Sequence, residues 1–412
     1  MSSDSIRDRA GAVSRLASLT KAPQGVPERS FEAPSSLMER ARRTLEERFE
    51  GVEGAVSGTG FAHGGIGLLA EHTHYFDGFA LFFSIPSGTA VAMRASSGEA
   101  SRLAFGGDDR TWTYGPDHPL PDTVPPPVRI VFETLRRLAP EDARADVAVA
   151  NAVPFSCADA YVAALGMAAA RACGEIFSPV REDRRICEQV HEAVEAGLGR
   201  YFSPAFLVAA EQGRPEQYSF VDAATLECML LEAAPEDALA FGLVETGDRT
   251  FFEAGAVARK RKMASEAAVI LRRKGFNAVT SLRELEHRDL LTATDAIPIR
   301  LRPALRWLVK ENQRVPKLVG AVQRKDWQLF GALLLMADAS TRKDWGGTTD
   351  VSDNAVDEVD AMTLDGMYGA FPMNRGRAVV MAGQPFVVPH CLDRVQAQLK
   401  EKFDMDMHVM LL

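Results

Sequence analysis

The chain has 412 residues, of which 46% are hydrophobic and 25% charged, as is typical of a globular protein large enough for two domains. Its formal net charge of −9 argues against a nucleic-acid partner, because binding nucleic acid needs a basic face. No apolar run approaches the roughly 18 residues that a membrane helix needs, so no membrane partner is expected.

The cysteines and the N-terminal segment both predict a cytoplasmic protein. The five cysteines are widely spaced and form no Cys-x-x-Cys pair, which is typical of reduced, mostly buried thiols. Residues 1–36 contain no apolar stretch of the kind found in signal peptides. A transit peptide is the alternative, because Arg and Ser are frequent there. The acidic residues speak against it: Asp4, Asp8, Glu28 and Glu32.

The first elements follow in chain order. Residues 1–36 show no sustained hydrophobic period, so we expect a poorly ordered or surface-wrapped arm. From Ser36 the apolar residues recur on one helical face, which predicts a helix ending near Gly51. The strand-like segments that follow are residues 55–57, 66–70, 79–85 and 89–94. We predict a glycine-rich turn between the first two of them.

A dense polar cluster, E-H-T-H-Y at 71–75, follows the second strand-like segment. Such a cluster at the end of a buried strand is where proteins present hydrogen-bonding groups to a small polar ligand. A metal site is the alternative, since His72 and His74 would share a strand face, with Glu71 and His63 nearby. Only two or three ligands would be in reach and no cysteine joins them, so no metal site is predicted.

This stretch resembles the first signature of the galactokinases, small-molecule kinases of the GHMP superfamily. That signature reads G-R-V-N-L-I-G-E-H-T-D-Y-N-G-G. The residues that fit it are Gly64, Leu68, Glu71, His72, Thr73, Tyr75 and Gly78. Three residues depart from it: Gly65 replaces an Arg, Gly67 an Asn and His74 an Asp. The resemblance implies that the sugar-binding residues are Glu71, His72, His74 and Asp77.

The change at His74 bears on the ligand. An Asp carboxylate only accepts hydrogen bonds, whereas a histidine can donate one and gain charge near neutral pH. The exchange favours a ligand with an extra acceptor or a carboxylate over plain galactose. If the cleft has been reused for chemistry other than phosphoryl transfer, His72 or His74 would be the catalytic acid–base group.

Residues 115–127 carry six prolines and are predicted to form a loop, followed by a helix over 128–138 and a strand over 145–152. The next run, V-P-F-S-C at 153–157, leads into an Ala-rich helix reaching about Ala172. It resembles the family's nucleotide loop, V-P-x-G-x-G-L-S-S-S-A-A, whose glycines let backbone N–H groups approach the phosphates at a helix start. Here those glycines are missing.

Ser156 and Cys157 are the remaining candidates for cofactor binding in this degenerate loop. A strand-to-helix turn with no ligand is the alternative for the loop. A nucleophilic role for Cys157 would require a base and an oxyanion site. A buried thiol at a helix start is the simpler interpretation.

The helix predicted over 185–195 and the loop over 197–204 lie where the family has G-[IM]-[MC]-D-Q, whose Asp is the proposed catalytic base. Placing Gln212-Gly213 on the family's Lys-Gly sets Ser203 opposite that Asp. A serine hydroxyl titrates far above neutral pH and is not a useful unassisted base. Because Gly65 also replaces the family's charge-stabilising Arg, both residues expected to act on the phosphoryl group are missing.

The second half follows the family in outline. A strand is predicted over 219–222, and a basic run at 259–262 opens a long helix; a solvated face is the simplest reading of that run, with phosphate binding as the alternative. The predicted helix over 302–322 matches R-A-x-H-x-x-x-E-x-x-R at Glu311 and Arg314, and residues 330–342 resemble F-G-x-L-M-x-x-S-H-x-S-L-R. The third signature, M-T-G-x-G-F-G-G, is degenerate before the strand predicted over 378–382. The three tryptophans of this half are expected in the core or an interface: Trp307, Trp327 and Trp345.

The resemblance implies an α+β, two-domain GHMP-kinase fold with the ligand cleft between the domains. We expect an arm over 1–36, a mixed-sheet domain over 37–215 and an α/β domain over 216–412. Three functions are compatible with it. The favoured one is a pseudokinase that binds a sugar or polyol and acts as a sensor or scaffold, with a possible protein partner and no cofactor. The others are an enzyme using the cleft for non-phosphoryl chemistry on a sugar-like or carboxylated substrate, and a divergent sugar 1-kinase using ATP and Mg.

Overall fold

The structure is a computed structural model that describes residues 31–50, 55–121, 123–177, 183–246 and 254–412. Most of the predicted arm, residues 1–30, therefore lies outside the described residues. The first described helix, α2 (Pro34–Arg48), buries Leu37, Ala41 and Leu45 on one face, as their spacing predicts.

The first half is built on a seven-stranded sheet around β2 (Phe79–Ala95). β2 pairs along its length with β1 (Ser57–Leu69) and, through its two halves, with β6 (Tyr218–Asp222) and β5 (Ala145–Asn151). The remaining strands are β3 (Ser101–Phe105), β4 (Thr111–Tyr114) and β7 (Cys228–Leu231). β3 and β5 are parallel and the other pairs are antiparallel, so the sheet is mixed, as expected.

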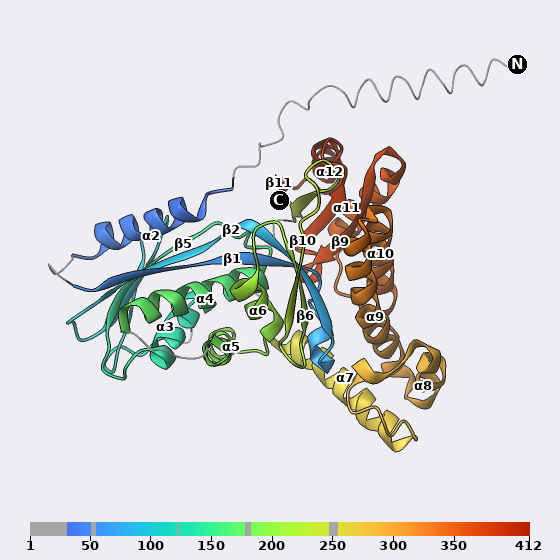
Figure 1. Ribbon diagram of the computed structural model, residues 1–412, viewed down its shortest axis with the longest axis horizontal. Coiled ribbons are helices and arrows are strands. Elements are labelled where there is room, and N and C mark those ends of the chain that lie inside the picture. The colour runs from blue at the N-terminus through green and yellow to red at the C-terminus, as the bar shows by residue number, and fades with distance from the viewer. Residues whose placement is uncertain (1–30, 51–54, 122, 178–182, 247–253) are drawn as a thin grey trace, which may run out of the picture.

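Helices cover both faces of this sheet (Figure 1). α2 packs on β2 and β5, and α4 (Ala158–Phe177) packs on β1 and β2 from the opposite side. The other helices of this half are α3 (Pro126–Leu138), α5 (Asp183–Leu198) and α6 (Pro204–Gln212). A large hydrophobic core includes the space between the sheet and α4, and a smaller one lies between the sheet and α2.

Two strand predictions need correction. β1 is one continuous strand through the glycines that we predicted to be a turn. The reason is the close approach of α4: a Cβ on Gly60 would lie 2.0 Å from the Ala168 carbonyl oxygen, so only glycine fits. β2 likewise joins two predicted segments through Pro86, opposite a register shift between His63 and Gly65 that accommodates the missing N–H.

α4 also corrects the expectation about apolar runs. Its 20 residues are long and apolar enough to cross a membrane by length and composition alone. However, 72% of its most apolar window is buried inside the protein, against the sheet. This placement is that of a core helix in a globular domain.

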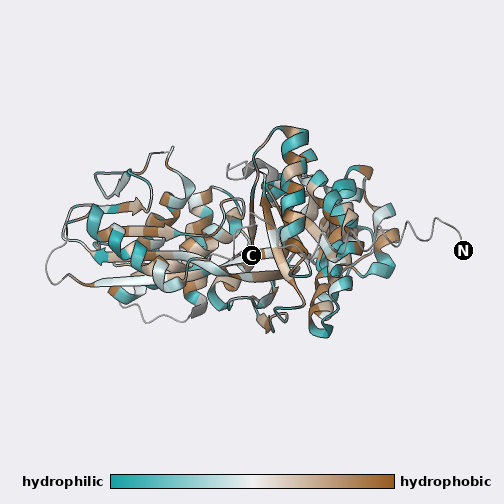
Figure 2. Ribbon diagram, turned by 90° about the horizontal axis from the view of Figure 1, so that it is seen from above, coloured by the Kyte–Doolittle hydropathy of each residue, from teal (hydrophilic) through white to brown (hydrophobic). Residues whose placement is uncertain are grey.

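The second half contains a four-stranded antiparallel sheet in the order β11-β8-β10-β9. Its strands are β8 (Ala240–Glu245), β9 (Met367–Met373), β10 (Ala378–Gly383) and β11 (His408–Leu411). Its helices are α7 (Ala254–Arg273), α8 (Leu290–Ala296), α9 (Arg302–Arg324), α10 (Trp327–Ser340), α11 (Asp350–Ala361) and α12 (Val388–Phe403). Figure 2 shows apolar strands in the middle and polar helix faces outside.

Short helical turns connect these elements and carry several site residues. They are η1 (Thr73–Phe76), η2 (Leu282–Glu284), η3 (His287–Asp289), η4 (Ile299–Leu301), the π-helical η5 (Thr341–Trp345), η6 (Thr363–Asp365) and η7 (Asn374–Gly376).

The two halves are joined by more than the chain. β6 and β7 follow residue 216, yet both belong to the sheet of the first half. The domain boundary at 215 and 216 stays a prediction. The Phe79 N–H donates to Asn312 Oδ1 at 2.8 Å, and Arg283 forms two hydrogen bonds to Asp222 at 2.7 and 2.8 Å. These contacts hold α9 and η2 against β2 and β6.

Candidate functional site

A cavity of about 510 Å³ opens where the turn after β1 and the start of α4 face α7, η5 and η7. Its lining includes Glu71 and His72 from the turn, Asp159 from α4, and Arg200 from the loop before α6. The facing wall includes Arg259 and Lys260 from α7, Trp345 from η5, and Arg375 from η7. The volume suits a small polar ligand of sugar size.

Glu71 is the acidic group at the centre of this site. Its Oε1 accepts a 2.6 Å hydrogen bond from the Asn374 N–H, which links the end of β1 to the end of β9. Burial raises the pKa of Glu71 to about 8, although that hydrogen bond and Arg200 lower it. At neutral pH the carboxyl group is therefore mostly protonated and can donate a hydrogen bond as well as accept one.

His72 lies beside a pair of stacked tryptophans. The rings of Trp307 and Trp345 are 4.4 Å apart at an interplanar angle of 12°, and the His72 ring centroid lies 5.6 and 5.2 Å from them. Trp307 Nε1 donates to Thr341 Oγ1 at 3.0 Å, so the indole polar group is satisfied. Trp307 belongs to the core as predicted, whereas Trp345 also forms a wall of the cavity.

Lys260 is a second titratable group with a shifted pKa. Its Nζ lies 3.7 Å from the Trp345 ring centroid and donates to the Trp345 carbonyl oxygen. Burial lowers the pKa of Lys260 to about 7, and the charge of Arg375 acts in the same direction. The basic run is therefore not only a solvated face, because Arg259 and Lys260 line the cavity.

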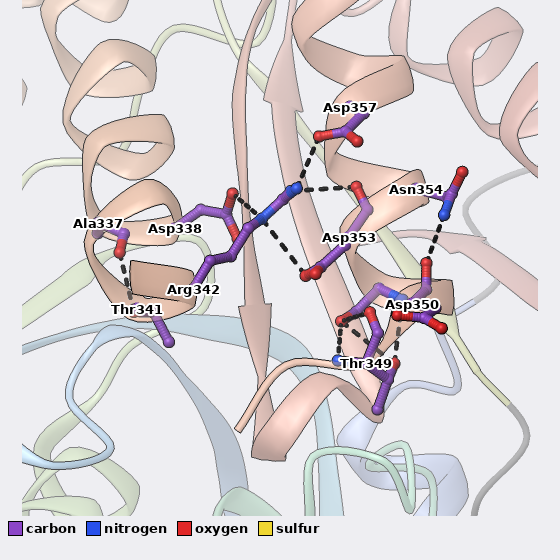
Figure 3. A network of polar contacts seen from close by, with 10 residues as sticks. Ala337, Asp338, Thr341, Arg342, Thr349, Asp350, Asp353, Asn354 and Asp357 are labelled. Atoms are coloured by element: carbon purple, nitrogen blue, oxygen red, sulfur yellow. Dashed lines mark hydrogen bonds and ion pairs between the residues drawn. The ribbon is translucent and has the colours of Figure 1, made fainter. Parts of the chain in front are cut away.

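A cluster around Arg342 holds the segment that carries Trp345 (Figure 3). Arg342 Nε lies 2.7 Å from Asp338 Oδ2 and 3.3 Å from Asp353 Oδ1, and Nη1 lies 2.8 Å from Asp357 Oδ1. One guanidinium thus joins α10, η5 and α11. Burial raises the pKa of Asp338 to about 6 despite the neighbouring Arg342.

Arg342→Gln is expected to lower the free energy of unfolding by about 2 kcal/mol, since three carboxylates would lose their shared cation. Urea denaturation at pH 7 measures the change. Arg394→Gln is the control: its ion pair with Glu358 is half exposed, so a change within about 0.5 kcal/mol is expected. Equal effects of both variants would contradict a special role for the Arg342 cluster.

The start of α4, where the resemblance places the nucleotide phosphates, is occupied by protein groups. The Ser156 N–H points at Glu245 Oε1 at 3.3 Å, and the Ser156 carbonyl accepts from Asn374 Nδ2 at 2.7 Å. Glu245 Oε2 lies 2.8 Å from His408 Nδ1. A carboxylate therefore lies beside the loop that leads into this helix start.

Cys157 is buried beside Ser156, as expected for a thiol at a helix start. Burial raises its pKa well above the ordinary value, which is the opposite of what a reactive thiolate needs. Neither Ser156 nor Cys157 lines the 510 Å³ cavity.

Arg200 occupies the site near the position where the family has its catalytic Asp. Its Nη2 lies 2.6 Å from Asp159 Oδ1, and both side chains are largely buried. Ser203, which the sequence alignment set opposite that Asp, is buried and does not line the cavity. Arg200 and Asp159 therefore form an ion pair that links α4 to the loop before α6.

The remaining predicted site residues have different positions. His74 lies in η1 rather than in a strand, and its side chain is outside the described part of the chain. Asp77 is exposed at a positive φ of 60°, its carbonyl accepts from Arg283 Nη1 at 2.6 Å, and its side chain does not line the cavity. Among the described residues, no group of three or more His, Cys, Asp or Glu is placed to hold a metal ion.

Sequence reasoning did not assign Asp159, Arg200, Trp345 or Arg375 to the site, and it gave ligand binding by the basic run that contains Lys260 only as an alternative. Two signals were available. Asp159 stands in the first turn of a helix next to the degenerate loop, and a Trp followed by two glycines, W-G-G at 345–347, is an unusual surface sequence. Neither signal identifies a ligand without the fold.

Comparisons with known proteins agree with this architecture. The family model for the galactokinase galactose-binding signature matches residues 45–95, which include the polar cluster. The galactokinase of Streptomyces coelicolor is 24% identical over 328 residues, covering 73% of this chain and 79% of that protein. The galactokinase of Actinobacillus succinogenes is 25% identical over 325 residues, covering 77% and 82%.

Solved structures show the same fold. Lactococcus lactis galactokinase complexed with galactose superimposes with a TM-score of 0.78 at 17% identity, covering 92% of this chain and 97% of that one. The L. major mevalonate kinase in complex with R-mevalonate gives a TM-score of 0.57 at 16% identity, covering 87% and 96%.

The two sheets, their order and the cavity between the halves define an α+β protein with the two-domain fold of the GHMP small-molecule kinases. Within this class, the first signature and the curated relatives make the chain most similar in sequence to galactokinases, from which it diverges at about 24% identity.

Proposed function

We propose that this protein is a cytoplasmic, galactokinase-like binder of a sugar or sugar-like polyol that does not transfer phosphate from ATP. The observation that carries the proposal is the occupied start of α4. Glu245 accepts a hydrogen bond from the Ser156 N–H in the loop that the resemblance assigns to the phosphates, and its negative charge would repel a phosphate there. Asn374 further ties the Ser156 carbonyl to η7, closing the loop that the family keeps open with glycines.

Ligand binding itself is supported by the preserved sugar side of the cavity. Glu71 offers a hydrogen-bonding partner for a sugar hydroxyl, and Trp345 adds apolar surface to the wall. A sensor or scaffold role would add a protein partner that recognises the liganded form.

Two other functions have support. An active sugar kinase using ATP and Mg is favoured by the relatives, which are named galactokinases. Non-phosphoryl chemistry is favoured by Glu71 and Lys260, whose pKa values of about 8 and about 7 would let them exchange protons near neutral pH.

Mg-ATP at millimolar concentration is expected to leave the melting temperature unchanged relative to Mg alone. A submillimolar binder at millimolar concentration would stabilise the protein by about 1–3 kcal/mol, which amounts to several degrees or less in a chain of this size. An ADP-release assay with galactose and other aldoses should show no turnover above a no-sugar control. In parallel, galactose binding is read from Trp345 fluorescence, with Trp345→Phe as the control for the signal.

Sugar-dependent ADP release that saturates with galactose would establish the kinase alternative. A melting-temperature rise with Mg-ATP but no turnover would show that nucleotide still binds through rearranged loops. Turnover of a sugar without ATP would support the non-phosphoryl alternative.

A further inference from the structure

We infer that the ligand of the 510 Å³ cavity is an anionic sugar derivative whose carboxylate or phosphate is received by Arg375 and Arg259. This inference rests on the proposed sugar-binding function and specifies its ligand class. It concerns the basic residues that α7 and η7 contribute to the cavity wall.

The charges on the cavity wall do not balance. Among the described residues, five basic side chains line it, Arg200, Arg259, Lys260, Arg300 and Arg375, against three acidic ones, Glu71, Asp159 and Asp344. Most of the acids are already used or neutral. Asp159 pairs with Arg200 at 2.6 Å, Asp344 pairs at 2.6 Å with Arg306 outside the cavity, and the raised pKa of Glu71 leaves it mostly protonated at neutral pH.

Some of the basic groups are likewise paired with an acid, and others are not. Arg300 is paired with Glu266 at 3.0 Å, which leaves Arg259, Lys260 and Arg375 facing the cavity. Within the described ranges, Arg259 and Arg375 have no hydrogen bond or ion pair, and both side chains are exposed. Guanidinium groups bind carboxylate and phosphate through two parallel hydrogen bonds, so two free ones on one wall suit an anionic group.

Arg375 is held in place by its backbone. Asn374 and Arg375 have positive φ values of 47° and 59°, a left-handed conformation that non-glycine residues adopt rarely. The neighbouring Asn374 is anchored on both sides, by its N–H to Glu71 Oε1 at 2.6 Å and by Nδ2 to the Ser156 carbonyl at 2.7 Å. Asn374 therefore fixes Glu71 and also holds the turn that places Arg375 at the cavity.

The shifted pKa of Lys260 reflects the same excess of positive charge on the cavity wall. Arg375 is close enough for its charge to lower the pKa of Lys260, and none of the described acidic groups acts on that pKa in the opposite direction. An anion placed between the two would relieve it. The hydroxyl-binding Glu71 and the anion-binding Arg375 then act on opposite ends of one ligand, which fits a sugar acid or sugar phosphate better than a neutral sugar.

Calorimetric titration with galactose, galacturonate, galactose 6-phosphate and inorganic phosphate tests the inference. We expect at least one anionic sugar to bind on the order of tenfold more tightly than galactose. The preferred probe distinguishes a carboxylate from a phosphate ligand. Arg375→Gln and, separately, Arg259→Gln should remove that preference by weakening the binding of the anionic sugar more than the binding of galactose. Arg272→Gln, an exposed position of α7 outside the cavity, should leave all affinities unchanged.

Equal or tighter binding of galactose, with no effect of either cavity variant on the anionic probes, would overturn the inference and leave the proposed function standing. Phosphorylation of galactose by ATP would overturn the proposed function instead. Binding of inorganic phosphate as tightly as any sugar would show a general anion site, and would contradict a ligand read jointly by Glu71 and Arg375. Failure of both anionic sugars to bind would also overturn the inference.

Discussion

Glu71→Gln is expected to stabilise the protein at pH 9 by about 3 kcal/mol. The pKa of Glu71 is raised from 4.5 to about 8, chiefly by burial, so the folded state holds this proton more tightly than the unfolded state. The stability linked to this group is complete below pH 4.5 and is lost as the pH rises through 8. Each pKa unit corresponds to about 1.4 kcal/mol, and partial exposure to the cavity reduces the total. Glutamine keeps an oxygen for the Asn374 N–H without carrying a charge.

Urea denaturation of both proteins at pH 5, 7 and 9 measures this effect. The difference between variant and wild type should be small at pH 5 and grow with pH. Glu47→Gln, at an exposed position of α2, serves as the control and should show no pH-dependent difference. Parallel stability curves for Glu71→Gln and wild type would show that the carboxyl group is ionised normally.

For ligand binding, Glu71→Ala should weaken sugar affinity on the order of tenfold, whereas Glu71→Gln retains a hydrogen-bonding group.

Gly331→Ala is expected to destabilise the protein by about 3 kcal/mol or more. Gly331 lies in α10 where it crosses β9, and a Cβ there would be 2.0 Å from the Tyr368 carbonyl oxygen and 2.1 Å from its carbon. These are backbone atoms, so no rotamer change relieves the clash, and α10 and β9 must separate. Because β9 leads directly into Asn374 and Arg375, the variant should also lose anionic ligand binding.

Gly174→Ala provides the matched control. Gly174 lies in α4, another long helix, but a Cβ there meets nothing within 4 Å. The same substitution should therefore stabilise the protein by about 0.5–1 kcal/mol through the helix propensity of alanine. Thermal and urea denaturation of the two variants should give changes of opposite sign. A near-neutral Gly331→Ala would mean that α10 and β9 are not in close contact.

The sequence by itself determined several local elements and the resemblance to the galactokinases. The period of Leu37, Ala41 and Leu45 predicts α2, the prolines of 115–127 predict the loop before α3, and the E-H-T-x-Y run identifies the galactokinase signature. The missing glycines around Ser156 are equally visible in sequence. Each of these inferences depends on residues within about twenty positions of one another, where periodicity, turn chemistry and motif spacing act.

Only the tertiary structure decided which groups share the cavity. Glu71 is held by Asn374, which is 303 residues away, and Ser156 is held by the same Asn374 across 218 residues. β1 runs straight through its glycines because α4 packs against it, a contact that no local pattern encodes. Burial then shifts the pKa values of Glu71 and Lys260, and the fold brings the exposed Arg259 and Arg375 to the same cavity. These properties arise from desolvation and charge proximity between distant segments, so they exist only once the chain has folded.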